Sequence, residues 1–175
     1  MPRKHVTPSR DPQQVDARSY NAVVGRTEIR GIRLLESRFE IKPEALEVDP
    51  SAWRKTVNFE VGEVVVTQET GKLYGVLQYE VICRHGRKRI LGATARYLVS
   101  YHVHGGCSQA DGEVFVERVG RVAVYPYFRS LIATLVADAG VQMPPLPVIS
   151  LAPRPLASAA ELVELGQENR PGTKK

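Results

Sequence analysis

The sequence predicts an α+β fold in which a four-stranded antiparallel sheet is followed by a long helix and a C-terminal helix. Three observations lead to this prediction. Residues 29–103 contain stretches in which apolar and polar residues alternate, as in strands with one buried face. Short connections join these stretches, which is typical of antiparallel neighbours. The most apolar helical stretch, residues 124–140, comes after the strands, so we expect it to cross the apolar face of the sheet.

The first two predicted strands differ in their regularity. Residues 29–41 indicate a strand whose buried face shifts near Leu34 and Leu35, because neighbouring leucines point to opposite faces of a regular strand. The second strand follows a loop that contains two prolines. Its apolar residues alternate strictly and are Val57, Phe59 and Val61.

The third and fourth strands form a predicted hairpin with its turn at His85 and Gly86. One face of the third strand carries Leu73, Leu77, Tyr79, Val81 and Cys83. One face of the fourth carries Leu91, Ala93, Ala95, Tyr97, Val99, Tyr101 and Val103. The other face of the third strand holds Tyr74, Val76 and Ile82, so we expect this strand to be covered on both sides.

The long helix is bracketed by residues that favour helix ends. Pro126 suits the first helical position, and Gly140 suits a left-handed cap at the other end. A wide apolar stripe lies between them and comprises Phe128, Leu131, Ile132, Leu135, Val136 and Ala139. A helix with such a stripe packs either in the core of one domain or between subunits. The Pro-rich residues 143–155 are expected to be extended.

The chain divides into three predicted parts. Residues 1–26 are rich in Pro, Arg, Gln and Ser and are expected to form a disordered basic arm. Residues 27–166 form one domain, whose last helix starts at Ser158 in a capping box completed by Glu161. Residues 167–175 are expected to be a flexible tail.

Composition favours a cytoplasmic protein without membrane insertion. No apolar run is long enough to span a bilayer, and the N-terminal residues lack the apolar centre of a signal peptide. The two cysteines, Cys83 and Cys107, are too few for a disulfide framework. The formal charge of +5 is compatible with an acidic partner, although several of these charges lie in the two ends of the chain.

The residues with catalytic or metal-binding chemistry do not form a recognisable site. His102, His104 and Cys107 lie close together in the sequence, but a fourth metal ligand is not evident. There is no phosphate-binding loop and no serine in a strand–turn–helix elbow. We therefore predict a protein that is not an enzyme and that binds neither a metal nor a cofactor.

The chain holds more apolar residues than one sheet and one helix can readily hide. An apolar excess of this kind indicates a surface for partners. The residues concerned are Trp53, Val57, Phe59, Val61, Tyr125, Met143, Leu146, Val148, Leu162 and Leu165.

Residues 28–151 resemble the SecB family of chaperones. The similarity is clearest in VYPYFRSLIATLVADAG and in the PPLPVISL segment after it, which resemble the family's pattern of a helix opened by Pro-Tyr-x-Arg and followed by a Pro-rich extended stretch. Weaker similarities are Trp53 with the alternating strand after it, Tyr74-x-Val76, and the first strand IRLLESRFEI.

The resemblance implies an ATP-independent holdase that holds unfolded polypeptide in long apolar grooves. It also implies a homotetramer, a dimer of dimers, assembled through long helices at Phe128, Leu131 and Leu135. Together with the apolar excess, it gives as client-binding residues Trp53, Val57, Phe59, Val61, Tyr125, Tyr127, Met143, Leu146, Leu162 and Leu165.

The client and the docking partner are less defined by the resemblance. Glu36 and Glu40 match the acids with which export chaperones dock onto the SecA motor. Thr94 replaces another such acid, and Arg87 and Lys88 replace acidic hairpin residues, which argues against SecA. Solitary SecB-like chaperones, which accompany a toxin–antitoxin pair and hold its antitoxin, also resemble this chain. The resemblance therefore implies as client either a dedicated antitoxin of a toxin–antitoxin–chaperone system or an exported precursor, and the charge changes slightly favour the antitoxin.

Two other classes compete with this interpretation. The basic residues 84–89 at the hairpin tip suit nucleic acid, although stacking aromatics are not clearly interleaved with them. An acyl-thioester enzyme of hot-dog type also wraps a sheet around a long helix. That fold places its helix before most strands, whereas here the helix comes late.

Overall fold

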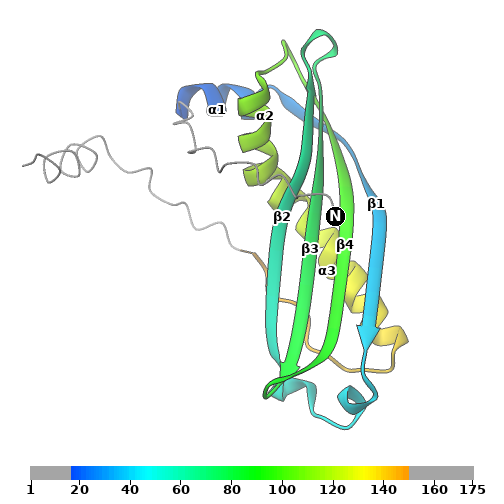
Figure 1. Cartoon of the computed structure of the whole chain (residues 1–175). Coiled ribbons are helices and arrows are strands. Elements are labelled where there is room, and N and C mark those ends of the chain that lie inside the picture. Colours follow the sequence, from blue (N-terminus) through cyan, green and yellow to red (C-terminus); the bar gives the residue numbers. More distant parts are fainter. Residues whose placement is uncertain (1–16, 150–175) are drawn as a thin grey trace, which may run out of the picture.

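The computed structural model describes the backbone of residues 17–149 and the side chains of residues 21–149 (Figure 1). The strands are β1 (Thr27–Ile41), β2 (Arg54–Thr67), β3 (Lys72–His85) and β4 (Lys88–Val103). The helices are α1 (Ala17–Val24), α2 (Gln109–Phe115) and α3 (Arg121–Asp138). A π-helical turn, η4 (Val116–Gly120), joins α2 to α3, and short 3-10 turns occupy Pro43–Leu46, Pro50–Ala52 and Gln68–Thr70.

The four strands form one antiparallel sheet with the order β1-β4-β3-β2, so β1 and β2 are the edge strands. This confirms the predicted sheet. The helix α3 crosses one face of the sheet diagonally (Figure 1). It follows the strands in the chain, which is not the order expected of a hot-dog fold.

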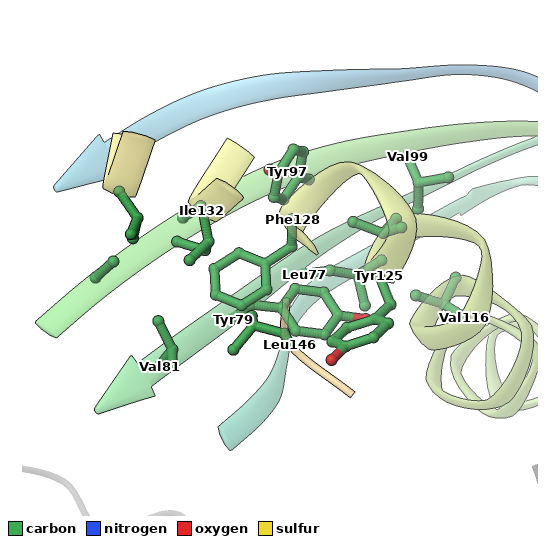
Figure 2. Close-up of a cluster of buried hydrophobic side chains, with 14 of the residues drawn as sticks. Leu77, Tyr79, Val81, Tyr97, Val99, Val116, Tyr125, Phe128, Ile132 and Leu146 are labelled. Carbon is green, nitrogen blue, oxygen red and sulfur yellow. The ribbon is translucent and has the colours of Figure 1, made fainter. Parts of the chain in front are cut away.

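The core lies between α3 and the faces of β3 and β4 that point toward it. Along both strands, residues alternate between buried and partly exposed, as the sequence predicted. Figure 2 shows Leu77, Tyr79 and Val81 directed toward Phe128 and Ile132. The rings of Tyr79 and Phe128 stack with their centroids 5.1 Å apart. Apolar burial between sheet and helix therefore organises the domain.

The opposite face of the sheet, here called the open face, carries none of the helices that the structure describes (Figure 1). Tyr74, Val76 and Ile82 are only partly buried there. The expectation that β3 is covered on both sides is wrong for the described part of the chain. Cross-strand neighbours on the open face shield these three side chains in part.

Strand β1 is irregular where the sequence predicted a change of face. Its register with β4 shifts between Ile29 and Gly31 and again between Leu34 and Glu36. The second shift confirms the interpretation of the two adjacent leucines. Each irregularity inserts an extra residue and bends the strand locally.

Helix α3 begins earlier than predicted, and the segment before it, for which the sequence allows a short helix or an extended crossover, is helical. Helix α2, the π turn and α3 follow one another without a gap, and Pro126 lies inside α3 rather than at its first position. The side chain of Ser108 caps α2 by accepting a hydrogen bond from the backbone N–H of Asp111. Proline interrupts only one backbone hydrogen bond, and packing against the sheet offsets that cost. The predicted helix start was therefore wrong.

Glycines allow this earlier helix to approach the sheet. A Cβ atom at Gly112 would lie 2.5 Å from Cγ2 of Val66, and one at Gly120 would lie 3.2 Å from Cδ1 of Leu77. At the other end, Gly140 has a φ of 72° and donates its backbone N–H to the Ala137 carbonyl, which confirms the predicted left-handed cap.

The two ends of the chain remain mostly outside the described residues. Helix α1 lies within the expected basic arm, and Val23 in it is buried, so the folded part includes residues before Thr27. The predicted C-terminal helix from Ser158 and the tail at 167–175 lie outside the described residues. Within residues 17–149, none of the helices combines the length and apolar character needed to cross a membrane.

Candidate client-binding surface

Strand β2 is an edge strand with a regular, half-buried apolar face. Val57, Phe59 and Val61 pair with Val81, Tyr79 and Leu77 of β3, and all three pack against the core while remaining partly exposed. Their even spacing follows from the period of two in a strand. The strand therefore combines an accessible row of apolar side chains with a free backbone edge.

Aromatic rings connect this row to the core. The Phe59 ring centroid lies 5.1 Å from that of Tyr79, which in turn lies 5.8 Å from that of Tyr125. The guanidinium carbon of Arg121 lies 5.3 Å from the Phe59 centroid, a distance typical of a cation–π contact. The Tyr79 hydroxyl donates a hydrogen bond to the Arg121 carbonyl. Phe59 is thus held between a fixed aromatic core and one long, polar side chain.

The segment after α3 contains no helix or strand over residues 141–149, and it is fastened to the core. The Tyr125 hydroxyl donates a hydrogen bond of 2.6 Å to the Pro147 carbonyl. Leu146 is buried, and the Met143 sulfur lies 3.8 Å from the Cys83 sulfur. A hollow of about 120 Å³ separates this segment from the end of α3 and is lined by Arg129, Ile132, Ala133, Met143 and Leu146 among others. Segment and helix together form an apolar furrow.

The structure divides the predicted client-binding residues by accessibility. Val57, Phe59, Val61 and Met143 are partly exposed, and Tyr127 is 55% exposed on α3. Three others form the floor rather than the surface, with exposures of 5% for Trp53, 4% for Tyr125 and 2% for Leu146. Leu162 and Leu165 lie outside the described residues.

The predicted subunit-interface residues also differ from one another. Phe128 has no exposed surface in the single chain, because it fills the space between α3 and Tyr79, so its prediction as an interface residue needs correction. Leu131 and Leu135 are partly exposed. The outward face of α3 lacks charged residues and consists of Ala123, Pro126, Tyr127, Ser130, Ala133, Thr134 and Ala137.

The predicted docking acids lie on β1, beside cationic side chains. Glu36 accepts a hydrogen bond of 2.9 Å from Nε of Arg38 and forms a 3.6 Å ion pair with Nη1 of Arg96. Glu40 is exposed. The negative charge of Glu36 is therefore largely compensated by its neighbours. A docking role for either acid stays a prediction.

One contributor to this surface was missed by the sequence analysis. The side chain of Gln109 donates a hydrogen bond of 2.8 Å to the Val64 carbonyl and accepts one of 3.2 Å from the Val66 N–H. It occupies the free backbone edge at the end of β2. No sequence signal links Gln109 to residues so far along the chain. The accessible edge of β2 is therefore the stretch before Val64.

The titratable groups near this surface do not form a catalytic set. Burial raises the pKa of the Cys83 and Cys107 thiols, which favours the unreactive protonated form. Burial likewise raises the pKa of the Tyr79 hydroxyl. His102 and His104 contact each other edge to face with ring centroids 4.7 Å apart. Within residues 21–149, no group of three potential ligands is placed to hold a metal ion.

Comparison with known proteins gives a structural match. No protein-family model matches the sequence, and no curated protein sequence matches it. Among solved structures, the chain is similar to the SecB-like chaperone Rv1957 of Mycobacterium tuberculosis in complex with a ChAD peptide from the HigA1 antitoxin. The TM-score is 0.64 at 18% identity, and the match covers 76% of this chain and 97% of that chain. The chain therefore has a SecB-like fold.

Proposed function

We propose that the protein is an ATP-independent holdase that binds unfolded polypeptide along β2 and the furrow beside α3. The observation that carries the proposal is the half-buried row of Val57, Phe59 and Val61 on an edge strand. An extended client can add to the free backbone edge before Val64 while its side chains contact this row. Many shallow apolar contacts retain a client without requiring one sequence.

The proposed client is a dedicated antitoxin, with exported precursors as the alternative. The similar SecB-like chaperone was solved with a peptide from an antitoxin, which supports this choice. The charge of Glu36 is compensated by Arg38 and Arg96, so it attracts a basic docking surface only weakly. A basic surface is what SecA is expected to present. An antitoxin presented as an extended segment would match the geometry of the β2 edge.

The proposed assembly is a homotetramer formed as a dimer of dimers in the cytoplasm. Its support is the outward face of α3, where small uncharged residues such as Ala123, Ala133 and Ala137 allow close helix packing. Leu131 and Leu135 lie beside this face and are only partly covered within one chain. Size exclusion with multi-angle light scattering measures the assembly directly.

Light scattering during dilution of a denatured protein tests the holdase activity. The chain is expected to suppress aggregation without nucleotide and at moderate salt, since apolar contacts are only weakly screened. Phe59→Ser should weaken suppression. Val65→Ser is the matched control, because Val65 lies on the same strand but on the open face.

Circular dichroism and size exclusion establish that both variants remain folded and assembled. Equal activity of the two variants would place client binding elsewhere. Absence of suppression by the unsubstituted chain, together with absence of binding to an antitoxin, would refute the holdase proposal. Binding of nucleic acid that is lost steeply with salt would instead favour the basic hairpin as the functional site.

A further inference from the structure

A second concave site lies on the open face, at the end of the sheet where β1, β4 and β3 meet. It is a hollow of about 340 Å³, here called the basic hollow. Its lining residues are Arg30, Arg33, Lys72, Tyr74, Leu98, Ser100, Tyr101 and His102. The cross-strand pairs Gly31–Ser100, Arg33–Leu98 and Lys72–His102 bring these residues together.

Small residues at the centre of the basic hollow create its depth. Gly31 has no side chain, and a Cβ atom there would lie 3.6 Å from the Ser100 hydroxyl. That hydroxyl donates a hydrogen bond of 3.3 Å to the Gly31 carbonyl. Longer side chains from β1, β3 and β4 surround Gly31 and Ser100. The register shift between Ile29 and Gly31 inserts Arg30 at the rim.

The basic hollow carries an excess of positive charge. Arg30 forms a 3.0 Å ion pair with Glu28, but the same carboxylate also accepts a hydrogen bond from His104 at 3.1 Å. Arg33 and Lys72 form no ion pair with any residue of 21–149. Of the three cationic side chains that line the basic hollow, only Arg30 has a carboxylate partner among residues 21–149. Two of the cations are available to an anionic ligand.

We propose that the basic hollow docks an acidic, extended segment of a partner protein. Arg33 and Lys72 would bind carboxylates of the segment, while Tyr74 and Leu98 offer it apolar contacts. A nucleic acid fits less well, because a uniformly charged phosphate backbone would leave the apolar side chains of Tyr74 and Leu98 in the hollow without contacts. The site is separate from the client-binding surface, which lies on the face covered by α3.

Fluorescence anisotropy with the full chain tests this proposal. The probe is a short labelled peptide of alternating glutamate and leucine, compared with a peptide of alternating lysine and leucine. The acidic peptide should bind, and added salt should weaken it. The double variant Arg33→Glu, Lys72→Glu should weaken binding about tenfold or more, because repulsion replaces attraction at both positions.

A matched control separates a specific site from general charge. The double variant Arg87→Glu, Lys88→Glu makes the same change in net charge at the β3–β4 hairpin and should leave binding within about twofold. Aggregation suppression should be unchanged in both double variants, so the outcome is independent of the proposed holdase activity. Thermal melting verifies that each variant is folded.

Three results would overturn the proposal. Equal affinities for the lysine peptide and the acidic peptide would show that the basic hollow does not discriminate between positive and negative charge. Equal weakening by the hairpin variant would show attraction to the whole basic chain rather than to the basic hollow. Displacement of the acidic peptide by single-stranded oligothymidine, with tighter binding of the oligonucleotide, would assign the basic hollow to nucleic acid.

Discussion

The two edge strands of the sheet, β2 and β1, differ in their regularity and in how far their apolar residues are covered. Strand β2 keeps a regular apolar row whose residues Val57, Phe59 and Val61 are half-covered by the core. Strand β1 is interrupted by two register shifts, and Leu34 and Leu35 are 47% and 51% exposed. Charged pairs such as Glu36 with Arg38 lie between its apolar residues.

The difference indicates which edge suits an unfolded chain. Up to Val61, β2 offers evenly spaced backbone groups and a continuous apolar row, and its own register shift lies beyond, between Val61 and Val64. The two register shifts and the charges of β1 hinder strand addition along that edge. We therefore propose β2, rather than β1, as the edge that binds a client. Aromatic support strengthens the same distinction, since the Phe59 ring centroid lies 5.1 Å from that of the buried Tyr79.

Removal of the ring at the centre of the core should have the largest effect. Phe128→Ala is expected to lower the free energy of unfolding by about 3–5 kcal/mol, because a buried aromatic side chain is replaced by a cavity. Urea denaturation measures the change. Leu135→Ala is the control on the same helix, with a smaller loss expected for its partly covered side chain. A dissociated but equally stable Phe128→Ala variant would restore Phe128 to a subunit interface.

The comparison between the edges is tested by one substitution on each. Phe59→Ala should lower the free energy of unfolding by about 2 kcal/mol, since the contact with Tyr79 is lost. Leu34→Ala should cost less than about 1 kcal/mol, because the side chain is half exposed. Chemical denaturation of both variants measures the two changes in the free energy of unfolding. A larger cost for Leu34→Ala would contradict the proposed difference between the edges.

Alkaline pH should destabilise the sheet through buried tyrosines. Burial raises the pKa of both Tyr97 and Tyr101 from 10.0 to about 12. The folded state then holds these protons more tightly than the unfolded state, so stability is complete below pH 10 and falls as the pH rises toward 12. Denaturation midpoints across this range measure the loss. Tyr97→Phe should reduce the fall in denaturation midpoint between pH 10 and pH 12. An unchanged fall would contradict the assignment of this pH dependence to Tyr97.

Acid should produce the smallest effect, on the β1 edge. The hydrogen bond from His104 and the charge of Arg30 lower the pKa of the Glu28 carboxyl from its usual value of 4.5. A lowered pKa contributes stability above 4.5, and this contribution is lost as the pH falls through the folded-state value. Glu28→Gln should therefore narrow the stability difference between neutral and acidic pH. An acid response unaffected by this substitution would assign the loss to other carboxyls.

The elements predicted well are those whose signals are local. Alternation in β2, β3 and β4 follows from one strand facing one core, and Gly140 ends its helix by its own conformational freedom. The bulge in β1 was also readable, because two adjacent leucines cannot share one face. These features need no knowledge of distant residues.

The elements predicted poorly depend on contacts between distant residues. Packing against the sheet carries the helix through Pro126, where local preference predicted a helix start. Likewise, the burial of Tyr125 and Phe128 results from the way α3 and the following segment close over β3. The role of Gln109 at the β2 edge arises only after the sheet and α2 have come together. Single-residue preferences contain none of this information.

Hydrogen–deuterium exchange of the full chain, with and without an unfolded client peptide, tests the central claim most directly. Client binding at the β2 edge should slow the exchange of backbone amides in residues 54–63 and in residues 143–148, while amides of β1 exchange as before. Protection of β1, or of the open face at Tyr74 and Leu98, with unchanged exchange in β2 would contradict the assignment of β2 as the client-binding edge.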